Sequence, residues 1–115
     1  MTLDELEQEI RAVSADPAVH DVANQLNAWK DSSDTADELS IAIERHIGNV
    51  WIGSDRDHER VYALWSTFRQ ESIEAIRGMT MNERLYSFGL LDRFYSLQSD
   101  GDRQVLYAKL HGRGT

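Results

Sequence analysis

The stretch that best indicates the fold is Thr35-Ala36-Asp37-Glu38-Leu39-Ser40-Ile41-Ala42-Ile43-Glu44-Arg45-His46-Ile47-Gly48. The stretch opens with a hydroxyl and a carboxylate three residues apart, which is the capping-box pattern of a helix start. Apolar residues then recur at helical spacing on one face, at Leu39, Ala42, Ile43 and Ile47. Gly48 is placed to end the helix. The stretch therefore predicts one amphipathic helix with a single buried face.

The same kinds of signal recur on both sides of this stretch. Capping residues precede the other apolar periods, at Thr2, Asp16 (followed by Pro17), Ser54 and Thr80 (a second capping box, with Glu83), and the stretch 99–102 is a turn and cap. With the apolar spacing, they predict helices over about residues 3–14, 17–30, 55–77 and 102–111, and one that opens after Thr80. The loop at 48–53 is predicted to be packed, with at most a short extended piece. The prediction is an all-α fold: a single compact bundle of five to six short helices.

Two of the predicted helices have features of their own. The longest, 55–77, has one main stripe of residues predicted to face the core, and Leu64 widens it. The stripe consists of His58, Val61, Trp65, Phe68, Ser72, Ala75 and Ile76. Its residues Tyr62, Leu64 and Ile73 spread apolar surface beyond one stripe, which favours either a central position or a dimer interface. The helix after Thr80 is expected to contain Gly89, which should weaken it by about 1 kcal/mol relative to alanine. A glycine there would also let another helix approach closely.

Length and composition predict one domain, residues 1–115, with 112–115 as a frayed tail. The chain has no cysteine, which excludes disulfides, thiolate metal sites and cysteine nucleophiles and fits a cytoplasmic location. No apolar run approaches the ~20 residues of a membrane span. The acidic start, Met1 to Glu5, does not match a secretory signal. We therefore expect a cytoplasmic protein.

Charge is distributed unevenly along the chain. The net charge is −8, with 12 lysines and arginines against 20 acids. Residues 1–55 contribute −9 and residues 56–115 contribute +1. An acidic surface repels nucleic acids and membranes and attracts basic proteins. We expect a protein partner with a basic surface, with neither nucleic acid nor membrane as a partner, and we keep a homodimer as an alternative.

The sequence contains no pattern that specifies catalysis, a metal or a cofactor. The four histidines, His20, His46, His58 and His111, lack the one-turn spacing of metal ligands on a helix and are interpreted as surface or interfacial residues. The acid pairs at 55–57 and 100–102 do not continue into a calcium loop, and helix capping explains both. Nucleotide loops and nucleophile elbows are missing as well. We therefore expect no enzyme and no cofactor.

The best candidate for a functional surface is a cluster of acids at Asp31, Asp34, Asp37 and Glu38. The plain alternative is a solvated, capped helix junction. Two tryptophans could serve as anchors beside the cluster. Trp29 ends an apolar stripe, so core packing is the favoured interpretation for it. For Trp51, in the loop between two glycines, core packing is also the favoured interpretation, although an exposed tryptophan would be a typical binding hot spot. The predicted partner-binding residues are Asp31, Asp34, Asp37, Glu38 and Trp51.

The stretch 81–94, Met-Asn-Glu-Arg-Leu-Tyr-Ser-Phe-Gly-Leu-Leu-Asp-Arg-Phe, resembles a segment found in many short bacterial helical proteins. That segment runs as N-E-R-L, three residues, G-L, an acid and an aromatic. The resemblance covers about an eighth of the chain. It implies a bacterial or phage origin and a helix, but it implies no activity and transfers no functional residue.

These observations support four hypotheses about function. The first is an immunity-type protein that neutralises a cognate bacterial toxin or another basic partner, because an acidic patch steers and complements a basic site. The second is a phage or plasmid inhibitor that mimics nucleic-acid charge to block a defence nuclease. The third is a structural homo-oligomerisation module. A small enzyme comes last.

Overall fold

The computed structural model describes residues 1–50 and 52–111, and this part of the chain folds entirely into helices and connecting loops. The predicted all-α class is confirmed. The described residues form seven α-helices, rather than five or six, and two short helical turns. The elements are α1 (Leu3–Arg11), α2 (Pro17–Trp29), α3 (Ala36–Asn49), α4 (Asp55–Phe68), the π-helix η1 (Arg69–Ile73), the 3-10 helix η2 (Ile76–Gly78), α5 (Met81–Ser87), α6 (Leu91–Ser96) and α7 (Asp100–Lys109).

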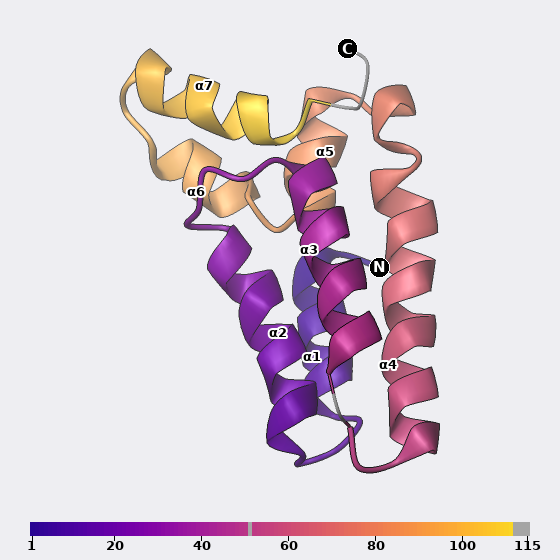
Figure 1. The fold of residues 1–115 in the computed structure, drawn as a ribbon. Coiled ribbons are helices and arrows are strands. Elements are labelled where there is room, and N and C mark those ends of the chain that lie inside the picture. Colours follow the sequence, from indigo (N-terminus) through magenta and orange to yellow (C-terminus); the bar gives the residue numbers. More distant parts are fainter. Residues whose placement is uncertain (51, 112–115) are drawn as a thin grey trace.

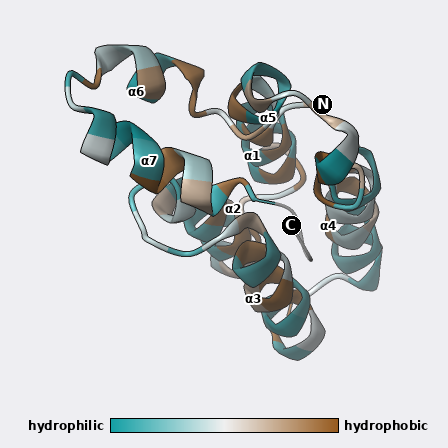
Figure 2. Ribbon diagram, turned by 90° about the horizontal axis from the view of Figure 1, so that it is seen from above, coloured by the Kyte–Doolittle hydropathy of each residue, from teal (hydrophilic) through white to brown (hydrophobic). Residues whose placement is uncertain are grey.

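The helices form two parts of different shape. Helices α1 to α4 make up a body, in which α2 and α3 run antiparallel in front of α1 and α4 stands at one side (Figure 1). Helices α6 and α7 form an arm that projects to one side of the body, as the view from above shows (Figure 2). Helix α5 connects the two parts. The molecule measures 45 × 26 × 21 Å along its principal axes.

The predicted helix caps are present. Thr35 Oγ1 accepts a hydrogen bond from Glu38 N at 3.2 Å, and Glu38 Oε1 accepts one from Thr35 N at 2.9 Å. The same reciprocal pair closes the start of α5, between Thr80 and Glu83. The side chain of Ser99 accepts from Asp102 N, so α7 begins at Asp100, two residues before the predicted start. Because each cap satisfies amides that the helix leaves free, it fixes where the element begins.

Aromatic rings link the body to α5. The Trp65 and Phe68 centroids lie 6.0 Å apart, Phe68 contacts Phe88 at 5.5 Å, and Phe88 contacts Trp29 at 5.6 Å. All four side chains are buried, so the prediction that Trp29 packs in the core is confirmed. Aliphatic side chains fill the rest of the body core: Leu3, Leu6, Ile10, Val19, Val22, Leu26, Leu39, Ile43, Ile47 and Val61.

The prediction of one continuous helix over 55–77 is wrong for the residues after Phe68. Regular α-helix ends at Phe68, and the amide of Glu74 bonds the carbonyl of Arg69 at 2.8 Å, five residues back. This π-turn accommodates one extra residue and rotates the face that follows. As a result Ile73 is buried, whereas Ala75, predicted to face the core, is exposed. Leu64 is buried as well, so of the three residues proposed to spread the apolar surface only Tyr62 remains exposed.

Gly89 ends a helix instead of lying inside one, and this splits the predicted element into α5 and α6. Its φ is +69°, a left-handed conformation that L side chains rarely adopt. The amide of Leu90 bonds the carbonyl of Leu85 at 2.8 Å, and the amide of Gly89 bonds that of Tyr86 at 3.2 Å. These two bonds are those of a Schellman motif, and the two leucines that frame it are both buried.

The loop after α3 is packed, as predicted. Ile52 is buried, and the amide of Gly53 donates to Asp16 Oδ2 at 3.1 Å. Hydrogen bonds from the amides of Ala18 and Gly53 hold the pKa of Asp16 below its ordinary value. The side chain that caps α2 therefore also ties down this loop. Among the described residues, no helix combines the length and the apolar character that crossing a bilayer requires.

Candidate functional site

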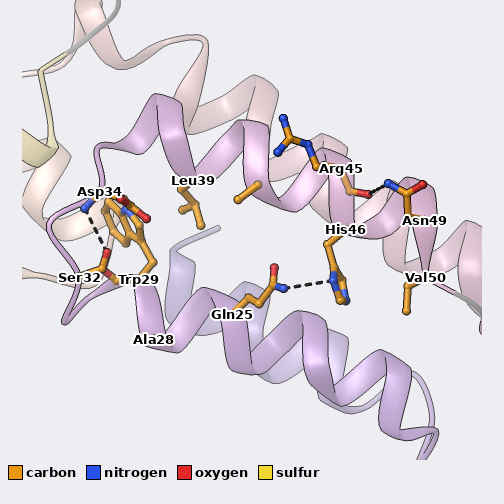
Figure 3. A pocket seen from close by; sticks show the side chains of 11 residues that line it. Gln25, Ala28, Trp29, Ser32, Asp34, Leu39, Arg45, His46, Asn49 and Val50 are labelled. Atoms are coloured by element: carbon orange, nitrogen blue, oxygen red, sulfur yellow. Dashed lines mark hydrogen bonds between the residues drawn. The ribbon is translucent and has the colours of Figure 1, made fainter.

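A groove of about 650 Å³ runs between α2 and α3 (Figure 3). Its apolar lining comes from both helices and from the residue after α3: Ala28, Trp29, Leu39, Ala42 and Val50. Its polar lining includes Gln25, Asp34 and His46. The face combines a concave apolar strip with a few polar groups, which is the usual make-up of a binding site.

The groove exists because two small residues stand where the helices could otherwise close the gap. Ala28 on α2 and Ala42 on α3 both line it and are both exposed. An alanine side chain ends at Cβ, so neither can fill the space over Trp29 and Leu39. Those two larger residues are 4% and 3% exposed and form a floor that is already packed. The groove can therefore accept an apolar side chain without a rearrangement of the core.

The two ends of the groove differ in chemistry. Ser32 and Asp34 lie with Trp29 at one end, and Asn49 and Val50 lie at the other (Figure 3). Across the middle, Gln25 Nε2 and His46 Nδ1 are 3.1 Å apart and hydrogen-bonded. Within the described residues, the Asp34 carboxylate is exposed and forms no ion pair. It is the acidic group that an incoming cation would meet at the groove.

A lysine from the arm supports the Asp34 end. Lys109, on α7, is 1% exposed, and its Nζ donates to the carbonyls of Trp29 at 2.7 Å, Ser32 at 2.5 Å and Asp34 at 3.1 Å. The ammonium also lies 4.2 Å from the centroid of the Trp29 ring, a cation–π contact. All three carbonyls belong to residues that line the groove. Lys109 therefore fixes the loop that carries Asp34.

Burial makes this lysine unusual in its acid–base behaviour. Desolvation lowers the pKa of Lys109, and the nearby carboxylate of Asp34 opposes that effect. A buried ammonium is tolerated only when its donors are satisfied, and here three carbonyl oxygens satisfy them. Because those carbonyls end α2 and start the following loop, the positive charge also lies at the negative end of the helix dipole.

The structure separates the four acids of the predicted cluster. Asp31 forms an ion pair with Arg93 of the arm, and this hydrogen-bonded pair lowers the pKa of Asp31. Glu38 is held in the capping box of α3, and Asp37 lines a different groove. Asp34 alone lines the α2–α3 groove. Trp51 lies outside the described residues.

Several groups of this site were not found from the sequence. Lys109 is separated from its partners by 75 to 80 residues, so no local pattern announces the contact. Ala28 has no signal of its own, and Ala42, predicted on the buried face of its helix, is exposed at the groove instead. The half-buried His58, interpreted from the sequence as a surface or interfacial residue, is hydrogen-bonded through Nε2 to the carbonyl of Ile47 at 2.9 Å.

Comparison of the chain with protein-family models, curated proteins and solved structures finds no match. The site is therefore interpreted from its own geometry. Within residues 1–50 and 52–111, no three His, Asp or Glu side chains come together in a group that could hold a metal ion.

Proposed function

We propose that this chain is an inhibitory protein-binding protein of the immunity type, and that its α2–α3 groove receives an apolar side chain from a basic partner. The observation that carries the proposal is the combination of an open apolar groove with an exposed carboxylate at its rim, that of Asp34, which has no ion-pair partner among residues 1–50 and 52–111. A toxin with a basic active site, such as a nuclease, is the kind of partner this combination suits.

Charge supports the choice of partner. Both helices of the groove lie in residues 1–55, which contribute −9 to the net charge of −8. The electrostatic field of this negative charge attracts a basic partner over distances comparable with the Debye length, about 8 Å at physiological ionic strength. It also raises the association rate well above that of an uncharged pair. The groove would then supply the short-range contacts that hold the complex.

The ion pairs favour this proposal over mimicry of a nucleic acid. A mimic needs many free carboxylates spaced like phosphates over the surface. Here several acids are already neutralised within the chain: Asp31 by Arg93, Asp4 by Lys30 and Glu44 by Arg69. A compact groove with an exposed acid, Asp34, at its rim fits the recognition of a protein side chain better.

The test is affinity capture from host lysate with four matched variants. Asp34→Lys reverses the charge at the rim, and Ala42→Trp fills the groove. Their controls are Glu59→Lys and Ala63→Trp, which make the same changes at exposed positions of α4, a helix that contributes no residue to the groove. All four changed positions are exposed, so the fold should survive.

We expect the wild type and both controls to retain the same basic protein at low salt, and the two groove variants to lose it. High salt should weaken the retained complex, because the association is steered by charge. Retention by all four variants would remove the groove from the proposal. Failure of the wild type to retain any basic protein would contradict the proposed function itself.

A further inference from the structure

A second groove, of about 510 Å³, lies between α3 and the turns that follow α4. Its apolar wall consists of three isoleucines, Ile41 of α3, Ile73 of η1 and Ile76 of η2. The π-turn makes this wall, because the extra residue it accommodates turns Ile73 inward. Such turns frequently mark functional sites.

The isoleucines form both a projection and a hollow on the same face. Ile41 is 53% exposed, so most of its side chain stands out from the surface. Ile73 and Ile76, at 7% and 2% exposed, form the packed side of the groove next to it. A two-fold contact between identical chains needs a self-complementary surface of this kind. The projecting residue of each copy then enters the hollow of the other copy.

The charges on this face are also self-complementary. Two acids and two bases line the groove, Asp37 and Glu74 against Arg69 and Arg77, so it is neutral although the chain carries −8. Arg69 is paired within the chain, with Glu44 and Glu74. Among the described residues, Asp37 and Arg77 have no ion-pair partner. Two strongly acidic chains repel each other, and a neutral face lowers that repulsion where they meet.

We propose that this face binds a second copy of the chain. In the resulting two-fold dimer, Ile41 of each copy enters the groove of the other. Asp37 of each copy faces Arg77 of the other, so every contact occurs twice. This surface is separate from the α2–α3 groove, and the dimer leaves that groove free for the partner proposed above.

The first experiment is sedimentation equilibrium of the purified chain across a wide concentration range. We expect the apparent mass to rise with concentration from 13.2 kDa toward twice that value. Ile41→Asp should abolish the rise. Val105→Asp is the matched control, because Val105 is equally exposed, at 53%, and lies on α7 outside this groove. A wild type that stays monomeric at millimolar concentration overturns the proposal.

A charge exchange tests the predicted orientation. Asp37→Arg and Arg77→Asp should each be monomeric alone, because like charges then face each other across the two-fold axis. Mixing the two variants should give a heterodimer, and a chain carrying both changes should dimerise again. Dimers that persist in all of these variants, or mixtures that stay monomeric while the wild type dimerises, contradict this arrangement. Neither result depends on the proposed toxin-type partner, since no other protein is present.

Discussion

The body and the arm depend on apolar burial to different degrees. In the body, α1 to α4 bury continuous rows of aliphatic and aromatic side chains. In the arm, α6 buries no residue and α7 buries only Leu106 and Lys109. The arm contributes Leu106 and Leu110 to the core, and charged groups attach it as well: Lys109 on the carbonyls after α2, and Arg93 on Asp31. Apolar burial is non-directional and cooperative, whereas these few bonds fix one orientation. The two parts should therefore respond differently to mutation.

The largest effect is expected from Trp65→Ala. Trp65 is fully buried in the body, and its Nε1 donates to Glu44 Oε1 at 2.8 Å. We expect the free energy of unfolding, measured in urea, to fall by about 3–5 kcal/mol. Tyr62→Ala, on the same helix but 42% exposed, is the control and should cost about 0.5 kcal/mol. Similar losses in the two variants would mean that the body is not held by burial.

Lys109→Met should act on the arm. The change removes the ammonium that donates to the carbonyls of Trp29, Ser32 and Asp34, which costs about 1–3 kcal/mol. We expect amide hydrogen exchange to speed up in α6, α7 and the loop after α2, while the amides of α1 and α4 keep their protection. Arg56→Met, an exposed change in the body, should alter neither. A uniform loss of protection would show that body and arm unfold as one unit.

Two glycine substitutions should have opposite signs. Gly89→Ala forces a side chain into a left-handed conformation and brings Cβ to 3.0 Å from Asp4 Oδ2, so it should destabilise the protein by about 1 kcal/mol. Gly48→Ala, within α3 and with open space around it, should stabilise by about 0.5–1 kcal/mol. Thermal unfolding of both variants gives the comparison. A Gly89→Ala protein as stable as the wild type would contradict the helix end described at this position.

The smallest effect concerns the exposed ion pair between arm and body. Arg93 lowers the pKa of Asp31 below the ordinary 3.8, so NMR titration of Arg93→Met should show that pKa rising toward 3.8. Because the pKa is lowered in the folded state, the pair stabilises the protein above pH 3.8 and this contribution disappears as the pH falls through the folded-state pKa. Asp16, whose pKa is lowered by backbone amides, should not respond. An unchanged Asp31 pKa would mean that Arg93 does not hold it.

Local signals explain why much of the body could be predicted from the sequence. The boxes at Thr35 and Thr80 involve residues three apart, and the buried faces follow the helical period. The prediction that Gly89 lies inside a helix was wrong, because the sequence pattern around a glycine is the same whether the glycine interrupts a helix or ends one. The π-turn at Arg69 was missed for a related reason, since apolar and small residues continue at helical spacing beyond Phe68.

The candidate site was less predictable, because its contacts join residues far apart in the chain. A count of acids cannot distinguish Asp31, paired with an arginine 62 residues away, from Asp34, which lines the groove and has no ion-pair partner in the described part of the chain. The groove itself depends on Ala28 of α2 and Ala42 of α3, which both line it. Their shared position at the groove is a property of the packing, so the sequence placed acidic residues near the site without locating the groove.

The lysine that fixes the groove also imposes an order of events during synthesis. Trp29 leaves the ribosome 80 residues before Lys109, and translation at about 5–20 residues per second makes that interval about 4–16 s. Throughout that time the loop bearing Asp34 lacks its ammonium. A nascent chain can thus assemble its helical body while the proposed recognition surface is still incomplete, and on that proposal competence to bind arrives only with α7.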